Sequence, residues 1–229
     1  MGRKKAAKGK LLVVSGFSGV GKGTVIRNLM TKFPNYVFSV SATTRAPRPG
    51  EVDGRDYFFI DTATFDAWVE EGRFLEYARF FGRSYGTLKD HVEDLRSRGK
   101  TVILDIEVEG AGNVCRLCPD AVSVYIIPPS AGELRDRLVG RGTESREQIM
   151  RRMTKAVAEA SVVSNYRYLV VNDVAEEAAA EIDRLVRGVG GPRLEREKAL
   201  KLTAVVQEDL QEILKDWQAC DNINSCIQD

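Results

Sequence analysis

A glycine-rich loop that joins a buried strand to a helix is the feature that most restricts how this chain can fold. Residues 11–15 (LLVVS) are continuously apolar, as expected for a short strand that is covered on both faces. The loop GFSGVGKGT follows at 16–24, and a helix is predicted from about Lys22 to Phe33. A strand, a glycine-rich turn and a helix N-terminus in this order direct backbone N–H groups toward an anion.

The spacing within this loop is that of a nucleoside triphosphate site. The pattern G-x-x-x-x-G-K is satisfied, so Lys22 is placed to neutralise the β and γ phosphate oxygens. The next position, usually Ser or Thr, is Gly23, and the nearest hydroxyl is that of Thr24. We therefore expect Mg²⁺ to be held mainly by phosphates and water. The loop residues predicted to bind ATP are Gly16, Ser18, Gly19, Val20, Gly21, Lys22, Gly23 and Thr24.

Most of the remaining chain alternates apolar strands with helices. Further strands are predicted at 36–41, 101–107, 121–128 and 168–172, and helices at 87–99, 130–140, 145–158 and 174–187. This alternation favours an α/β core with a mainly parallel sheet covered by helices on both faces. The stretch 51–80, with strands at 55–60 and 73–80 around a short helix at 64–72, is interpreted as a small mixed insertion.

The composition fits a folded protein of one or two domains and disfavours several functions. The chain has 229 residues, and 34 Lys and Arg balance 33 Asp and Glu, which argues against bulk affinity for nucleic acid. No apolar run approaches the roughly 20 residues of a membrane span. The apolar run after the basic residues 1–10 is too short for a signal peptide, so we expect a cytoplasmic protein that does not bind membranes. A single histidine, His91, disfavours metal sites and catalytic triads that depend on histidine.

The four cysteines predict neither a zinc site nor a disulfide framework. Cys115 and Cys118 form a C-x-x-C, whereas Cys220 and Cys226 follow about a hundred residues later with a different spacing. We interpret all four as reduced thiols, and the C-x-x-C as the end of a helix that precedes a proline.

The segment 39–58, SVSATTRAPRPGEVDGRDYF, points to the second substrate. Its pattern S-x-T-T-R-x-P-R-x-G-E-x-x-G-x-D-Y-F resembles the guanylate kinases at every fixed position. The resemblance covers about 11–188 and recurs in FLEYA (74–78), YGT (85–87), LDIE (104–107), IIPPS (126–130) and RGTES (141–145). It implies a P-loop α/β fold, Mg²⁺ as cofactor, and in-line transfer of the ATP γ-phosphoryl group to GMP or dGMP.

The resemblance also assigns polar side chains to GMP. Two arginines three positions apart, Arg45 and Arg48, are suited to grip the phosphate as fixed forks. A carboxylate, Glu76, accepts both N–H donors of the guanine edge, so the site should reject AMP. The full predicted set is Ser41, Arg45, Arg48, Tyr57, Glu76, Tyr85, Thr87 and Glu107. Two alternatives stay open, namely that Thr87 is only a helix cap and that Glu107 is only structural.

Further residues are expected at the reacting phosphates. Asp105 ends an apolar strand, and a carboxylate at that edge is the usual acid on the Mg²⁺ side, acting here through water. The lid of the family supplies two arginines, which match Arg141 and Arg152, with Arg137 as a third candidate. Asn172 is expected near adenine. The predicted catalytic set, which acts by positioning and charge neutralisation, is Lys22, Arg48, Arg141 and Arg152.

The predicted organisation has a basic tail at 1–10, a kinase domain at 11–188 and an extension at 189–229. Within the domain, the GMP-binding region spans about 41–90 and the lid about 130–158. The extension consists of a linker and an amphipathic helix, and the family usually ends before it. The apolar stripe of this helix either folds back on the chain's own core or pairs with a second copy in a homodimer.

Two other functions and one unusual position complete the sequence-based expectations. A guanylate-kinase-like module that binds phosphopeptides without catalysis usually has a degraded phosphate loop, whereas this chain keeps Lys22 and the predicted arginines. A kinase for another nucleoside monophosphate is separated by assays with GMP, dGMP, AMP, CMP and UMP. The family usually has Gln where this chain has Glu109, which adds negative charge near two other acids.

Overall fold

The computed structural model describes residues 7–80, 82–140, 142 and 144–225. The chain divides into two compact units. The first consists of the chain up to Val14 together with residues 30–123, and the second of residues 15–29 together with the chain from Val124 onward. The glycine-rich loop therefore belongs to the second unit, and the segment with the GMP pattern belongs to the first.

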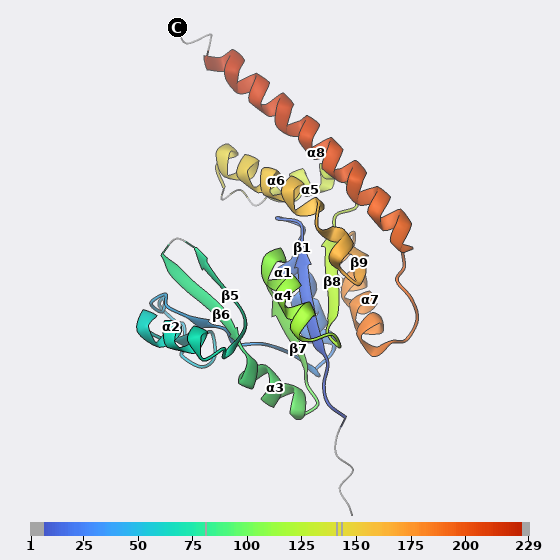
Figure 1. The fold of residues 1–229 in the computed structure, drawn as a ribbon. Coiled ribbons are helices and arrows are strands. Elements are labelled where there is room, and N and C mark those ends of the chain that lie inside the picture. Colours follow the sequence, from blue (N-terminus) through green and yellow to red (C-terminus); the bar gives the residue numbers. More distant parts are fainter. Residues whose placement is uncertain (1–6, 81, 141, 143, 226–229) are drawn as a thin grey trace, which may run out of the picture. The chain divides into compact units, whose positions relative to one another are not determined.

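The first unit contains three parallel strands, β1 (Leu11–Gly16), β7 (Thr101–Asp105) and β2 (Tyr36–Phe38). The central strand β7 pairs with the other two, with Leu11 opposite Val102 and Tyr36 opposite Thr101. Along β7 every residue is buried except Asp105, which is exposed at the carboxyl end. Helices α3 (Lys89–Ser97) and α4 (Val108–Leu117) flank this strand in the chain (Figure 1).

The second unit contains a parallel pair, β8 (Val122–Ile127) and β9 (Tyr168–Val171), with Val124 opposite Tyr168. Just after β1, the Phe17 N–H donates to the Ile126 carbonyl at 3.2 Å. The strand order is β2-β7-β1-β8-β9, which confirms the predicted parallel sheet. The helices of this unit are α1 (Lys22–Lys32), α5 (Ala131–Val139), α6 (Arg146–Ala160), the short 3₁₀ helix η1 (Val163–Asn165), α7 (Ala175–Arg187) and α8 (Arg196–Ser225).

The first unit also carries a second, mixed sheet in the order β4-β3-β6-β5. Its strands are β3 (Ala42–Thr43), β4 (Phe58–Phe59), β5 (Phe74–Phe80) and β6 (Arg83–Leu88), and helix α2 (Thr62–Glu70) connects β4 to β5. The pair β3–β4 is parallel, whereas β6 runs antiparallel to both β3 and β5. Phe65 of α2 stacks on Phe74 at a centroid distance of 4.6 Å in its small core. This sheet contains the mixed insertion predicted at 51–80 and extends beyond it on both sides, to β3 and β6.

Several predicted boundaries are wrong in this insertion. The helix expected from residue 87 begins at Lys89, because residues 83–88 form β6, which was not predicted. The strand expected at 55–60 shrinks to two residues. Ahead of it, the carboxylates of Asp53 and Asp56 accept backbone N–H groups and hold the segment as a turn.

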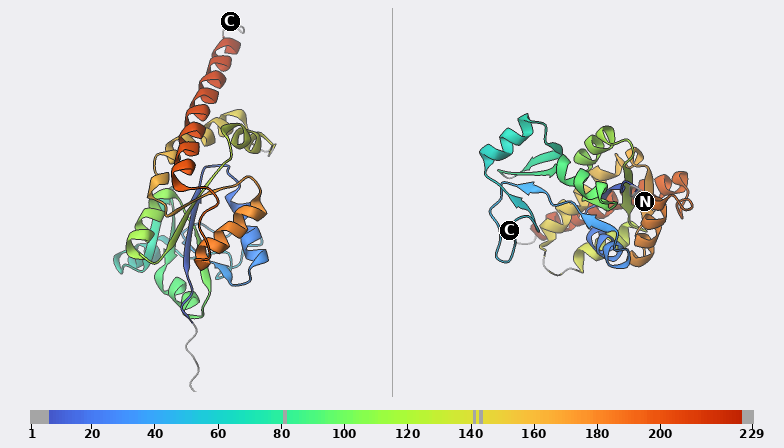
Figure 2. Two further views of the ribbon diagram at one scale, coloured as in Figure 1. Left: turned by 90° about the vertical axis from the view of Figure 1, so that its right-hand side faces the viewer. Right: turned by 90° about the horizontal axis from the view of Figure 1, so that it is seen from below.

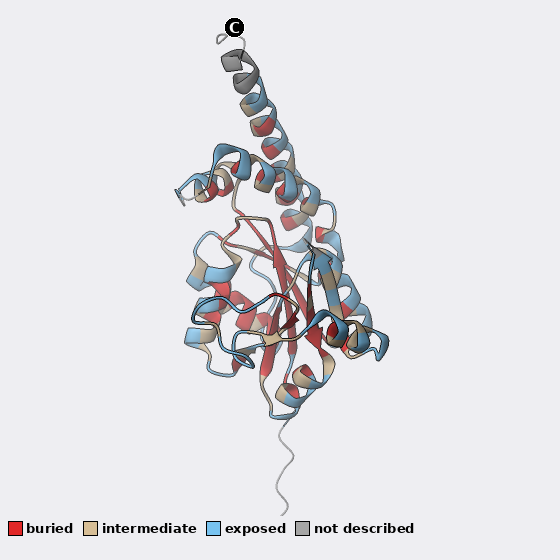
Figure 3. Ribbon diagram, turned by 90° about the vertical axis from the view of Figure 1, so that its left-hand side faces the viewer, coloured by how far each residue is buried: buried red, intermediate tan, exposed pale blue. Residues whose placement is uncertain are grey.

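The C-terminal extension is dominated by the 30-residue helix α8, which packs on its own unit (Figures 1 and 2). It contacts α5, α6, η1 and β9. Its buried residues recur in steps of three or four, as on one face of an amphipathic helix, and Figure 3 shows buried and exposed positions alternating along it. They are Ala199, Thr203, Val206, Leu210 and Leu214.

Polar contacts fix α8 along its length. The Arg196 guanidinium donates to the carbonyls of Ser164 and Tyr166 at 2.5 and 2.7 Å. Further along, the Gln207 amide donates to the Val157 carbonyl at 3.1 Å. Like every other described helix, α8 is not long and apolar enough to cross a membrane.

Replacing Leu210 should test this packing. Leu210 is fully buried, so Leu210→Ala is expected to lower the free energy of unfolding by about 2–4 kcal/mol. Val205 lies on the same helix and is 52% exposed, so Val205→Ala should change stability by less than about 0.5 kcal/mol. Urea unfolding of both variants measures the difference, and equal effects would show that α8 is not packed as described.

Candidate nucleotide-binding sites

The glycine-rich loop is shaped by two glycines that adopt positive φ. Gly19 and Gly21 have φ of 91° and 89°, a region that other residues rarely adopt. A Cβ at Gly21 would lie 2.8 Å from the amide nitrogen of Asn172. Helix α1 begins at Lys22, and the N–H groups of a first helical turn have no acceptor within the helix. The loop therefore offers donors and the positive end of a helix dipole to an anion.

A cavity of about 420 Å³ lies beside this loop within the second unit. Its lining residues are Gly19, Gly21, Thr24, Arg137, Gly140, Asn172, Asp173 and Ala175. The buried Asn172 amide donates to the Val20 carbonyl at 2.7 Å, while its Oδ1 has no hydrogen-bond partner within the described part of the chain. Asn172 is therefore a buried polar side chain in the wall of a cavity large enough for a nucleotide base.

Arg137 holds the walls of this cavity together. Its guanidinium donates to the carbonyls of Asn172 at 2.8 Å and of Val20 at 3.3 Å. These bonds tie the end of β9 to the glycine-rich loop. Arg137 is thus an integral part of the cavity wall.

The lid region contributes Arg152 from α6, which starts with a capping box between Ser145 and Gln148. The Arg152 guanidinium pairs with the Glu144 carboxylate at 3.2 Å, and the Glu144 side chain is 18% exposed. The second predicted lid arginine, Arg141, lies outside the described residues.

A second cavity, of about 320 Å³, lies within the first unit. Its lining includes four residues that the sequence predicts as ligands of GMP or Mg²⁺, namely Ser41, Tyr57, Thr87 and Asp105. Glu107 is exposed at the N-cap of α4, where it makes no side-chain capping bond. Glu109 lies in the first turn of α4, and the helix dipole there favours a negative charge.

Glu76 is held beside this cavity by Thr87. The Thr87 hydroxyl donates to Glu76 Oε1 at 2.6 Å. Burial raises the pKa of Glu76, and the bonds from Thr87 oppose that rise. Thr87 is not a helix cap, because α3 has Leu88 at its N-cap. On the other side, a Cβ at Gly110 would come within 2.9 Å of Glu76 Oε2, so only glycine fits there without displacing the carboxylate.

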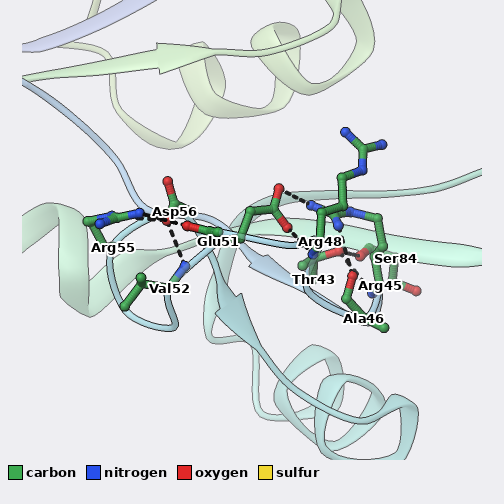
Figure 4. A network of polar contacts seen from close by, with 10 residues as sticks. Thr43, Arg45, Ala46, Arg48, Glu51, Val52, Arg55, Asp56 and Ser84 are labelled. Atoms are coloured by element: carbon green, nitrogen blue, oxygen red, sulfur yellow. Dashed lines mark hydrogen bonds and ion pairs between the residues drawn. The ribbon is translucent and has the colours of Figure 1, made fainter.

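The two arginines predicted to bind the GMP phosphate share one carboxylate, that of Glu51 (Figure 4). Arg45 is 7% exposed and pairs with Glu51 Oε1 at 2.8 Å. The Arg48 backbone N–H donates to Glu51 Oε2 at 2.7 Å, while the residue itself is exposed. The hydrogen bond from Arg45 is the largest cause of the lowered pKa of Glu51, which keeps this carboxylate ionised.

Two tyrosines complete this group. The Arg45 guanidinium lies over the Tyr57 ring at 5.3 Å from its centroid, and Tyr57 contacts Tyr85 edge-on at 6.1 Å. Arg45 and both tyrosines therefore come together as predicted. Sequence reasoning gave no role to Glu51 or Glu144, although each stands in a motif that carries the resemblance, at R-P-G-E and R-G-T-E-S.

The described residues contain no cluster of three or more His, Cys, Asp or Glu side chains suited to hold a metal ion. A single carboxylate such as that of Asp105 is sufficient for Mg²⁺. In proteins this ion keeps most of its water ligands and binds one or two carboxylates together with substrate phosphates. Cys115 and Cys118 are free thiols, and burial raises the pKa of both. Cys118 ends α4 as predicted, while the side chain of Cys220 and all of Cys226 lie outside the described residues.

Comparison with known proteins decides the family, because the guanylate kinase model matches residues 8–188. The chain belongs to the guanylate kinase family. A guanylate kinase of Thermus thermophilus is 45% identical over 217 residues, which cover 92% of this chain and 96% of that protein. Guanylate kinase of Rubrobacter xylanophilus is 47% identical over 182 residues, or 80% and 95% of the two chains.

A solved structure agrees with this assignment. The crystal structure of guanylate kinase from Anaplasma phagocytophilum matches with a TM-score of 0.61 and 32% identity, over 84% of this chain and 90% of that chain. The fold is that of P-loop nucleotide kinases, and the chain is a guanylate kinase enzyme by family.

The relatives also bear on the C-terminal extension. A continuous match over 92% of 229 residues, as with the Thermus guanylate kinase, must extend to at least about residue 210, inside α8. Guanylate kinase of Clostridioides difficile, 40% identical, covers 90% of this chain and 98% of its own. The expectation that the family ends before the extension is wrong for these relatives.

Removing the Glu51 carboxylate should weaken the phosphate-binding group. In Glu51→Ala, Arg45 loses its ion-pair partner and the turn at Arg48 loses an acceptor, so we expect GMP affinity to fall by about tenfold. Glu70→Ala, at an exposed position of the same unit, is the matched control. Titration calorimetry with GMP measures both, and unchanged affinity in Glu51→Ala would contradict this role.

Proposed function

We propose that this guanylate kinase transfers the γ-phosphoryl group of ATP to GMP, giving GDP and ADP, and that it also accepts dGMP. The observation that carries the proposal is the half-buried Glu76 carboxylate held by Thr87. Guanine presents N1–H and N2–H₂ as adjacent donors, and a carboxylate accepts both. Adenine has an acceptor at the first of these positions and would leave a buried oxygen unpaired, which costs about 1–3 kcal/mol or more.

The GMP phosphate is proposed to bind Arg45, Arg48, Tyr57 and Tyr85. Arg45 is already oriented by Glu51 and by the Tyr57 ring, so little side-chain entropy is lost when the phosphate enters. Ser41 is proposed at the guanine edge and Glu107 near the base or ribose. The phosphate and base contacts make no use of the 2′-hydroxyl, which supports the acceptance of dGMP.

ATP is proposed to bind the glycine-rich loop through backbone N–H groups, Lys22 and Thr24, with adenine in the cavity beside Asn172. The position of Asn172 in the wall of that cavity supports this placement of adenine. Lys22, Arg141 and Arg152 neutralise charge on the transferring phosphoryl group. The GMP phosphate oxygen itself attacks phosphorus in line with the leaving ADP oxygen, so no protein nucleophile is required. Inversion of configuration at a chiral γ-phosphorus tests this geometry.

Asp105 is the residue proposed to hold Mg²⁺, through water. When bound, the ion would neutralise negative charge on the ATP phosphates. The exposed carboxylate at the end of β7 supplies the one protein anion that such a hydrated ion needs. Gly23 leaves the rest of the coordination to phosphates and water.

We propose that α8 acts within its own chain and that the enzyme is a monomer of 25.4 kDa. The apolar stripe that could have paired two copies is already covered by α5, α6 and β9. Sedimentation equilibrium should give the monomer mass, and a stable dimer would contradict the proposal.

A coupled ADP-release assay with GMP, dGMP, AMP, CMP and UMP tests the proposed function. We expect turnover with GMP and dGMP and at least a 10³-fold lower kcat/KM with the other three. Glu76→Gln should lower kcat/KM for GMP by an amount equivalent to about 2–4 kcal/mol while the KM for ATP changes little. Comparable rates with GMP and AMP, or no turnover of any nucleotide, would overturn the proposal.

The lid arginine has a matched control on the same helix. Arg152→Met should lower kcat by about 100-fold or more, because the guanidinium acts on charge that rearranges in the transition state. Arg151 is the neighbouring residue and is 65% exposed in a pair with Glu147, so Arg151→Met should leave kcat within about twofold. Steady-state kinetics of both variants decide, and near-normal turnover in Arg152→Met would remove it from the reaction centre.

A further inference from the structure

A carboxylate near the C-terminal end of α6 is bonded to the backbone of the glycine-rich loop. Oε2 of Glu159 accepts the Ser18 N–H at 2.9 Å, a contact between residues 141 positions apart. The Glu159 side chain is only 10% exposed. A carboxylate this buried must be compensated by donors or opposite charge, so the bond is a built part of the site. None of the roles proposed above uses Glu159.

The bond to Glu159 uses the Ser18 N–H, one of several loop donors that are bonded within the protein. Phe17 donates its N–H to Ile126 and Val20 donates to Phe17, so these donors, like that of Ser18, are committed within the protein. At the start of α1 the N–H groups of Thr24 and Val25 donate to the Gly21 carbonyl at 3.0 and 3.2 Å. The donors suited to phosphate are the other N–H groups of the loop and of the first helical turn. Glu159 therefore fixes the conformation of the loop and does not compete with the nucleotide for its anion-binding donors.

The same helix carries the lid arginine. Arg152 and Glu159 are seven residues apart in α6, which places them on one face about two turns, or roughly 10 Å, apart. Lys155 lies between them, with its ammonium 3.7 Å from Glu159 Oε1. This cation reduces the repulsion that a buried carboxylate would exert on nearby phosphates.

We propose that Glu159 is a positioning residue that keeps the phosphate-binding loop and Arg152 in register, so that one rigid helix presents both to the phosphates of ATP. The inference rests on the proposed ATP site. It assigns to Glu159 an effect on ATP binding and turnover, and none on GMP binding, because Glu159 and the GMP residues belong to different units.

Two substitutions of Glu159 distinguish the effect of its acceptor oxygen from the effect of its negative charge. Glu159→Ala removes the acceptor of the Ser18 N–H and should weaken binding of a non-hydrolysable ATP analogue by about tenfold, raise the KM for ATP and lower kcat, with the KM for GMP unchanged. Glu159→Gln keeps an acceptor oxygen and should stay within about threefold of the wild type. Glu147→Ala, at an exposed position of the same helix, is the control and should behave as wild type.

Separate calorimetric titrations, one with the ATP analogue alone and one with GMP alone, distinguish the outcomes. If the wild type does not bind the analogue, the proposed function fails. If the wild type binds and Glu159→Ala binds equally well, the inference is wrong while the proposed function stands. Equal loss of ATP and GMP affinity in Glu159→Ala, or a tenfold loss in Glu159→Gln, would also overturn it. If Glu159→Ala does not fold, Glu159→Met fills the same volume without an acceptor and takes its place.

Discussion

Two of the arginines proposed to bind phosphate, and the glycine-rich loop itself, are held by carboxylates of their own unit, and the proposed site depends on this pairing. Arg45 pairs with Glu51, Arg152 pairs with Glu144, and the glycine-rich loop is bonded to Glu159. Partly buried guanidinium groups need such anions before any substrate binds. The same pairing fixes their orientation, so an entering phosphate meets donors already in place and little reorganisation is required.

The division of the chain explains how one protein holds two nucleotides with different chemistry. The groups proposed for ATP lie in the second unit, and those proposed for GMP lie in the first, each beside a cavity of its own. The loop proposed to bind triphosphate would recognise only charge and shape, whereas the Glu76–Thr87 pair is proposed to recognise the base. Phosphoryl transfer requires that the two nucleotides meet with water excluded.

The sequence predicts best what short-range physics dictates. The apolar strands predicted at 11–15 and 101–107 and the glycine-rich loop are clear in the sequence, because burial on both faces and positive φ restrict residue choice strongly. The second strand ends at Asp105, two residues earlier than predicted. Strand β6 (RSYGTL) was missed because its apolar content is low and its pairing with β5 is set by tertiary contacts. The Glu159–Ser18 bond could not be predicted, because no local pattern shows which carboxylate reaches a loop 141 positions away.

Binding of a single bisubstrate ligand tests the account most directly. In a dinucleotide pentaphosphate, adenosine and guanosine are joined by a chain of phosphates long enough to mimic ATP and GMP in line. The account predicts one molecule bound per chain by calorimetry, at least 100-fold more tightly than GMP or ATP alone, and displaced by either nucleotide. The analogue with adenosine at both ends should bind far more weakly. Equal affinity for the two analogues, or binding of free GMP to the saturated complex, would contradict the account.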